Sequence, residues 1–141
     1  MTALILLVHA DSVVLQRLEA VLLKEGHAVA TATSFKWAKQ LLSSIGPDLL
    51  VADVRLGAFN GLGLALRAQL DHADLPVIIT DSTYDPVLER EATSLGVVYV
   101  VNPLQNAEFL SNVKTAVDAH AGEHPPRGGY VPSQHRAAEP R

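Results

Sequence analysis

Three side chains that could do chemistry stand directly after short apolar runs of the sequence. His9 and Asp11 follow the run 4–8, and Asp53 follows the run 49–52. Imidazole and carboxylate groups can ligate a metal ion or contact a phosphate, and histidine titrates near neutral pH. Each residue also has a structural interpretation: a hydrogen-bonded histidine for His9, a helix-entry residue for Asp11 and a turn residue for Asp53. Both interpretations stay open at this point.

The composition excludes several other kinds of chemistry. The chain of 141 residues has no cysteine, which rules out disulfides, cysteine-ligated zinc and thiol catalysis. Its net charge of −4 argues against a basic surface for nucleic acid, so direct binding of nucleic acid is not expected. The sequence has no glycine-rich phosphate loop and no nucleophile elbow. A catalytic or small-molecule-binding protein is therefore an alternative that no motif supports.

The apolar runs also bear on location in the cell. The longest, such as residues 4–8, are five or six residues long, far too short to span a membrane. The N-terminus lacks the positive segment and the long apolar stretch of a signal peptide. We therefore expect a cytoplasmic protein that does not enter the membrane.

Apolar runs alternate with helical patterns over residues 1–119, and this alternation predicts the fold. Strands are predicted at residues 4–8, 28–32, 49–52, 76–79 and 97–101. A helix is predicted after each strand, with Ser12, Ser34 and Asp85 as caps of the first, second and fourth. Five strand–helix pairs joined by short turns predict a doubly wound, flavodoxin-like α/β domain. Its parallel sheet has the strand order 2-1-3-4-5, with helices on both faces.

The composition changes at residue 120. Residues 120–141 hold four of the eight prolines and three of the nine glycines, and no apolar periodicity runs through them. Such a segment cannot bury enough apolar surface to offset its ordering entropy, so it is predicted to be a flexible tail or the stub of a linker. His120, His124 and His135 lack a fixed helical spacing, which favours a solvated segment over a metal-binding one.

The predicted sheet brings the reactive side chains to one edge. Ligands of such sheets bind at the carboxyl ends of the strands, next to the point where the strand order reverses. The first and third strands flank that point. We therefore expect His9, Ala10, Asp11 and Asp53 at the site, with the ends of the fourth and fifth strands beside them.

Five short segments, in this order and spacing, carry a resemblance to a known family. They are residues 6–12 (LLVHADS), 47–53 (PDLLVAD), 60–62 (NGL), 75–79 (LPVII) and 99–103 (YVVNP). Together they resemble the receiver domain of bacterial two-component response regulators, over about residues 3–118. The resemblance implies a signalling module rather than an enzyme. It also implies that Asp53 accepts a phosphoryl group from a histidine kinase while Mg²⁺ neutralises the phosphoryl oxygens.

The sequence departs from the family pattern at most positions around Asp53. The family's pair of acidic residues falls on His9 and Ala10, so Asp11, one place later, is the only acid there. The family's lysine falls on Asn102, a neutral amide that cannot supply a cation. The phospho-accepting aspartate is thus the one core functional residue that is kept.

The switch positions are less clearly assigned. The family's hydroxyl after the fourth strand falls on Asp81, whereas a one-residue shift would place it on Thr80. Tyr99 either turns in and out with the state of the pocket or is fixed. The resemblance also implies a cis peptide bond between Asn102 and Pro103.

These losses lead to the hypothesis of a degenerate stand-alone receiver in phosphorelay signalling. Mg²⁺ would bind weakly, to Asp11 and Asp53 at most. Two ligand carboxylates are missing, and so is a charge-assisted hydrogen bond of ~1.5–3 kcal/mol. Arg55 is either a replacement cation that pairs with Asp53 or a solvated surface arginine. The alternative is an ordinary receiver that is phosphorylated at Asp53 and acts as a phosphate relay.

The expected partners follow from the same resemblance. They are a histidine kinase or other signalling proteins. Receivers often dimerise through the surface of the fourth helix, the fifth strand and the fifth helix, so a homodimer through that face is a further expectation. With an impaired pocket, protein–protein contacts would carry the function.

Overall fold

Five parallel strands form the central sheet of the computed structural model, which describes residues 2–123, with side chains through residue 120. The strands are β1 (Leu4–Val8), β2 (Ala28–Ala32), β3 (Leu49–Asp53), β6 (Val77–Asp81) and β7 (Val98–Val101). Their order is β2-β1-β3-β6-β7, which is 2-1-3-4-5 when the strands of this sheet are counted along the chain. All neighbours pair in parallel. The predicted α/β fold is therefore confirmed.

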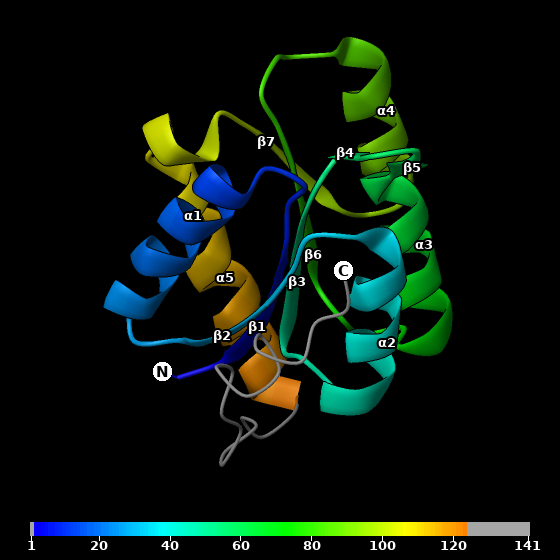
Figure 1. Ribbon diagram of the computed structural model, residues 1–141. Helices are drawn as coiled ribbons and strands as arrows, with labels where there is room; N and C mark the ends of the chain where they lie inside the picture. Colours follow the sequence, from blue (N-terminus) through cyan, green and yellow to red (C-terminus); the bar gives the residue numbers. More distant parts are fainter. Residues whose placement is uncertain (1, 124–141) are drawn as a thin grey trace.

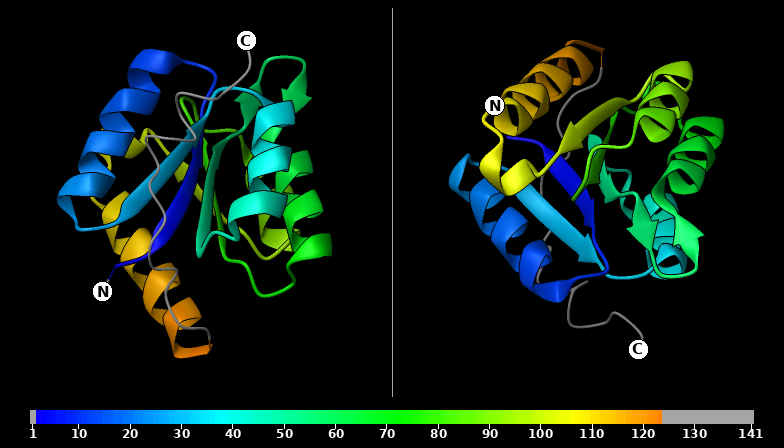
Figure 2. Two further views of the ribbon diagram at one scale, coloured as in Figure 1. Left: turned by 60° about the horizontal axis from the view of Figure 1, so that its bottom comes forward. Right: turned by 90° about the horizontal axis from the view of Figure 1, so that it is seen from above.

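Helices cover both faces of the sheet (Figure 1). They are α1 (Ser12–Lys24), α2 (Phe35–Ile45), α3 (Gly61–Asp71), α4 (Pro86–Ser94) and α5 (Glu108–Glu123), with a short 3-10 helix η1 (Pro103–Gln105) before α5. Helices α1 and α5 lie on one face, and α2, α3 and α4 lie on the other, as Figure 2 also shows. Among the described residues, no helix is long and apolar enough to cross a membrane.

The core has two layers because side chains alternate along each strand. In β1, Leu6 and Val8 pack with residues of α2, α3 and α4, whereas Ile5 and Leu7 pack with residues of α1 and α5. All five residues of β1 are buried, and so are all five of β3 and of β6. Strands buried on both faces are almost continuously apolar, which is why the sequence predicted them so directly.

Capping side chains set the starts of the helices. Ser34 caps α2, and Asp85 caps α4 with Pro86 in its first turn, as predicted. The prediction for α1 was wrong by one residue. Asp11 is the cap, because its carboxylate accepts from the backbone N–H groups of Val13 and Val14, and Ser12 is the first helical residue.

Two features differ from the expected pattern of elements. A small antiparallel hairpin, β4 (Arg55–Leu56) with β5 (Phe59–Asn60), follows β3 and lies above α3 in Figure 1. Strands of two residues are too short to produce a periodic signal, so the sequence did not reveal it. Helix α5 continues to Glu123, so residues 120–123 of the predicted tail are helical. The rest of that tail, 124–141, lies outside the described residues.

Candidate functional site

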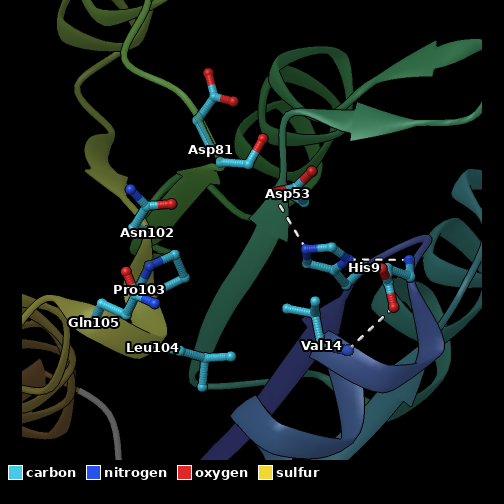
Figure 3. A pocket seen from close by; sticks show the side chains of 10 residues that line it. His9, Val14, Asp53, Asp81, Asn102, Pro103, Leu104 and Gln105 are labelled. Atoms are coloured by element: carbon cyan, nitrogen blue, oxygen red, sulfur yellow. Dashed lines mark hydrogen bonds and ion pairs between the residues drawn. The ribbon is translucent and has the colours of Figure 1, made fainter.

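A cavity of about 300 Å³ opens at the carboxyl edge of the sheet, where β1 and β3 lie side by side (Figure 3). It is lined by His9, Asp11, Val14, Asp53, Asp81, Ser82, Asn102, Pro103, Leu104 and Gln105. Most of the residues singled out in the sequence therefore meet in one place. Thr80, Arg55 and Tyr99 do not line the cavity, but each contacts an aspartate that does.

Asp53 ends β3 and is almost fully buried. Three groups surround its carboxylate. The hydroxyl of Thr80, its register partner on β6, donates to Oδ1 at 2.9 Å, and the backbone N–H of Arg55 donates to Oδ2 at 3.2 Å. Nε2 of His9 lies 3.5 Å from Oδ1. Strand β3 and its neighbours thus hold the carboxylate in a fixed orientation at the floor of the cavity.

His9 follows β1 and turns its ring towards Asp53, as Figure 3 shows. Its Nδ1 accepts a hydrogen bond from the backbone N–H of Asp11 at 3.0 Å. Since Nδ1 is the acceptor, the neutral ring carries its proton on Nε2, the nitrogen that faces Asp53. His9 is therefore a hydrogen-bonded histidine at a strand end, and it also points a donor into the cavity.

Asp11 uses its carboxylate to start α1. Oδ1 accepts from the N–H of Val13 at 2.9 Å and from that of Val14 at 3.2 Å. The helix-entry interpretation of Asp11 thus describes its contacts. Its side chain still borders the cavity.

Asp81 ends β6 and is completely buried. The guanidinium of Arg55 forms an ion pair with its Oδ1, and the phenol of Tyr99 donates to Oδ2 at 2.7 Å. Of the two alternatives for Arg55, a cation paired with Asp53 and a solvated surface arginine, neither describes this contact, because the guanidinium pairs with Asp81. The neighbouring carboxylate raises the pKa of Arg55, which stays charged.

The two candidates for the hydroxyl position, Thr80 and Asp81, make different contacts. Thr80 directs its hydroxyl at Asp53, while Asp81 lies in the cavity wall and bonds to Tyr99. Register explains the first contact, since Thr80 and Asp53 are directly paired in the sheet. The one-residue shift thus gives the hydroxyl that contacts the carboxylate of β3.

Tyr99 lies on β7, partly buried, with its hydroxyl turned in towards Asp81. The same oxygen accepts from the backbone N–H of Asp85 at 3.0 Å. Burial, reinforced by the hydrogen bond to Asp81, raises the pKa of Tyr99 to about 12. The structure contains Tyr99 in an inward position, which is compatible with both alternatives, a residue that turns in and out and a fixed one.

The expected cis bond between Asn102 and Pro103 was wrong, since no peptide bond among the described residues is cis. Instead, Asn102 adopts a left-handed backbone conformation with φ of 49°, which asparagine tolerates better than most residues. Its N–H donates to the carbonyl oxygen of Asp81 at 2.7 Å, and Pro103 begins η1. The left-handed residue therefore makes the turn for which a cis bond was expected.

The pairing of Asp81 with Arg55 and with Tyr99 was missed by sequence reasoning. The signal was present, because β3, β6 and β7 are adjacent parallel strands and their carboxyl ends must lie together. No signal in the sequence indicated the β4–β5 hairpin, which follows β3 and sets the position of Arg55. Without it, Arg55 could not be assigned to either aspartate.

Comparisons with known proteins agree with this architecture. The family model of the response regulator receiver domain matches residues 5–114. The transcriptional regulatory protein AfsQ1 of Streptomyces coelicolor is 34% identical over 118 residues, which cover 80% of this chain and 50% of that protein. The alginate biosynthesis transcriptional regulatory protein AlgB of Pseudomonas aeruginosa is 35% identical over 102 residues, covering 70% of this chain and 22% of that protein.

Solved structures show the same fold. The receiver domain protein of Methanospirillum hungatei superposes with a TM-score of 0.80 at 19% identity, covering 88% of this chain and 100% of that one. A response regulator from Chloroflexus aurantiacus gives 0.77 at 26% identity, covering 84% and 99%. The chain belongs to the response regulator receiver domain family, and it is a signalling module of two-component systems rather than an enzyme. It spans about half or less of the length of the curated relatives described above.

Receiver domains typically use Mg²⁺, so the fit of the cavity to this ion can be tested on its side chains. Mg²⁺ favours an octahedral set of oxygen ligands that includes carboxylates. Here the carboxylate of Asp11 caps α1, and that of Asp81 is paired with Arg55. Among the described residues, no three histidine or acidic side chains are grouped so that they could hold a metal ion. The side chains around the cavity therefore do not fit this ion.

Proposed function

We propose that this chain is a degenerate receiver, with impaired Mg²⁺-dependent phosphorylation at Asp53, that acts through protein–protein contacts. The observation that carries this proposal is the set of groups around Asp53. His9 and Ala10 stand where the family has acids, and Asn102 stands where it has lysine. The nearby cation, Arg55, is engaged by Asp81. The charges that would bind a divalent ion and then hold a phosphoryl group are therefore missing or occupied.

The direct test is phosphorylation by acetyl phosphate with Mg²⁺, followed by intact mass spectrometry. We expect modification well below stoichiometric amounts. A variant with the family's residues restored, His9→Asp/Ala10→Asp/Asn102→Lys, should be modified by orders of magnitude faster, and Asp53→Asn in that background should abolish the gain. Ready, stoichiometric modification of the unaltered chain at Asp53 would overturn the proposal.

A second candidate is the ordinary receiver that relays phosphate through Asp53. It is favoured by one observation, the hydroxyl of Thr80 bonded to the Asp53 carboxylate, since a hydroxyl beside the acceptor is what the family uses. Transfer from a phosphorylated histidine kinase would distinguish it, because a cognate kinase could overcome a weak metal site. Failure of such transfer in a folded chain would count against this candidate.

We propose that partners bind at the surface of α4, β7 and α5, with a second copy of the chain as one of them. Three exposed apolar side chains support this: Tyr84 before α4, Val87 on α4 and Val98 on β7. Strand β7 is also an edge strand of the sheet. Sedimentation of the wild-type chain and of Val98→Lys measures the association. A monomer over the whole concentration range in both proteins would remove the homodimer.

We also propose that residues 1–119, together with the end of α5, form the receiver domain, that the segment after α5 is a tail or linker, and that the protein is cytoplasmic. Limited proteolysis of the full chain tests the boundary, because a tail should be cleaved before any site within the core.

A further inference from the structure

A buried carboxylate at the end of β6 joins three separate segments of the chain. Asp81 is fully buried, bonded to Arg55 from the hairpin and to Tyr99 from β7. Its own backbone carbonyl accepts from the N–H of Asn102. The N–H of Thr83 is 3.4 Å from Oδ1. One side chain thus connects the hairpin, the last strand and the segment that leads into α4.

The charge of Asp81 makes these contacts interdependent. A carboxylate that is fully removed from water is costly unless it is paired and hydrogen-bonded. Arg55 supplies the cation and Tyr99 supplies a donor, so the network is favourable only while both are in place. Loss of one partner therefore weakens the position of the other, although Arg55 and Tyr99 are joined only through Asp81.

Tyr99 passes the constraint on to the start of α4. Its oxygen accepts from the N–H of Asp85, and the Asp85 carboxylate in turn caps α4 by accepting from the N–H groups of Val87 and Leu88. The ring of Tyr84 packs edge-on against that of Tyr99, with centroids 6.3 Å apart. The segment 82–85 is therefore held from both ends by the same tyrosine and aspartate.

We propose that Arg55, Asp81 and Tyr99 form an internal lock that holds segment 82–85 and the start of α4 in one conformation without any phosphoryl group on Asp53. The inference rests on the proposed function for the identity of the surface that is presented, namely that of α4, β7 and α5. The lock removes the need for a switch: the Asp81 carboxylate, paired with Arg55, already holds the Tyr99 hydroxyl inward, and a phosphoryl group on Asp53 would add negative charge at the same cavity.

Amide exchange measured by NMR on the full chain tests the lock directly, because the Asp85 N–H donates to Tyr99. The decisive variant is Arg55→Gln. In the wild type, the Arg55 guanidinium makes no hydrogen bond with Asp85. Since 59% of the Arg55 side chain is exposed, the substitution leaves the core intact. We expect the exchange of the Asp85 and Thr83 amides to rise by about tenfold. Arg67→Gln, which breaks the exposed pair of Arg67 with Asp71, is the matched control and should leave both rates unchanged.

Two further variants sharpen the test. Asp81→Asn keeps an oxygen for Tyr99 but removes the charge, and the double variant Arg55→Gln/Asp81→Asn should exchange no faster than Asp81→Asn alone. Tyr99→Phe should accelerate the Asp85 amide, whereas Tyr84→Phe should not. Asp85 and Thr83 rates in Arg55→Gln within twofold of the wild type would overturn the lock.

Titration of the wild-type chain with Mg²⁺ and beryllofluoride separates the lock from the proposed function. Shifts at Asp53 that leave Tyr99 and Asp85 unmoved would support the lock and count against the impaired pocket. Shifts that spread to Tyr99 and Asp85 would overturn both. Absence of any shift supports the impaired pocket, and the exchange rates of Arg55→Gln then decide the lock by themselves.

Discussion

A buried carboxylate lies at each end of the strands, Asp48 at the amino edge of the sheet and Asp81 at the carboxyl edge, and the two have different hydrogen-bond partners. At the amino edge, Asp48 is bonded to the backbone of β1: its Oδ2 accepts from the N–H of Leu4 at 2.9 Å, and its own N–H donates to the carbonyl of Leu4 at 2.7 Å. Nε2 of His120 lies 3.5 Å from its Oδ1. At the carboxyl edge, Asp81 is held by the side chains of Arg55 and Tyr99.

The difference separates architecture from function. Asp48 extends the hydrogen bonding between β1 and the start of β3, so it cannot move unless the strands move. The partners of Asp81 lie on a hairpin and on β7, and Tyr99 carries the connection into a loop. A side-chain network between loops can adopt a second arrangement while the sheet stays intact. The same residue type therefore closes the sheet at one edge and organises a site at the other.

The largest effect on stability is expected at Gly61, which packs against the backbone of Asp53 at the carboxyl edge. A Cβ added at Gly61 would lie 2.2 Å from the carbonyl oxygen of Asp53, which is backbone and cannot rotate away. We expect Gly61→Ala to lower the free energy of unfolding by about 3 kcal/mol or more and to disturb the Asp53 amide signal. Urea denaturation and NMR measure both.

Gly63 is the matched control for that substitution. It lies in the same helix, and a Cβ there meets nothing within 4 Å. Gly63→Ala should raise the free energy of unfolding by about 0.5–1 kcal/mol, because alanine loses less backbone entropy in a helix. Equal effects of the two substitutions would show that helix propensity, and not the contact with Asp53, decides the cost.

The next largest effect is at the amino edge. Asp48→Ala leaves the N–H of Leu4 buried without its acceptor, which should cost about 1–3 kcal/mol in urea denaturation. Asp48→Asn keeps an oxygen for that N–H and should cost less. Neither change should alter amide exchange at Asp85. Faster exchange there in Asp48→Ala would break the distinction between the two edges.

The sequence was a good guide to the layers of the fold and a poorer one to its edge. Buried parallel strands such as β1 and β3 are continuous apolar runs, and capping residues such as Ser34 and Asp85 mark helix starts, so these elements were predicted. Hairpin β4–β5 was not, because its four residues carry no periodic pattern. Local sequence encodes an element when burial repeats along it, and two-residue strands offer no repeat.

The sequence predicted which strand ends meet at the cavity, but not how their side chains pair. Parallel topology places His9, Asp53 and Asp81 at one edge, and the cavity contains all three. The partner of Arg55 depends on where the hairpin returns, and the hydroxyl that contacts Asp53 depends on strand register. Both are long-range geometric facts that a local pattern cannot supply. The left-handed conformation of Asn102 belongs to the same class.

A smaller effect on stability is expected at alkaline pH, from Tyr99 at the carboxyl edge. The pKa of Tyr99 is raised to about 12 from an ordinary value of 10, first by burial and then by its bond to Asp81. The neutral phenol is therefore favoured by folding. Its contribution to stability is complete below pH 10 and is lost as the pH rises through about 12. Tyr99→Phe should flatten the decline of the urea midpoint between pH 10 and 12, whereas Asp48→Asn should not.

The smallest effect is expected in acid, at the amino edge, where His27 stands directly before β2. Burial lowers the pKa of His27 below its ordinary value of 6.5, and its Nδ1 is buried without a hydrogen-bond partner among the described residues. The neutral ring is thus favoured by folding. Its contribution is complete above pH 6.5 and is lost as the pH falls through the lowered value. The urea midpoint of the wild type should therefore fall more steeply between pH 7 and 5 than that of His27→Gln. At each pH, the Asp85 amide should exchange at the same rate in the two proteins.

Parallel declines of the urea midpoint in the two proteins would contradict the assignment to His27. If the Asp85 amide of the wild type exchanged faster in acid than that of His27→Gln, the amino edge would be coupled to the lock.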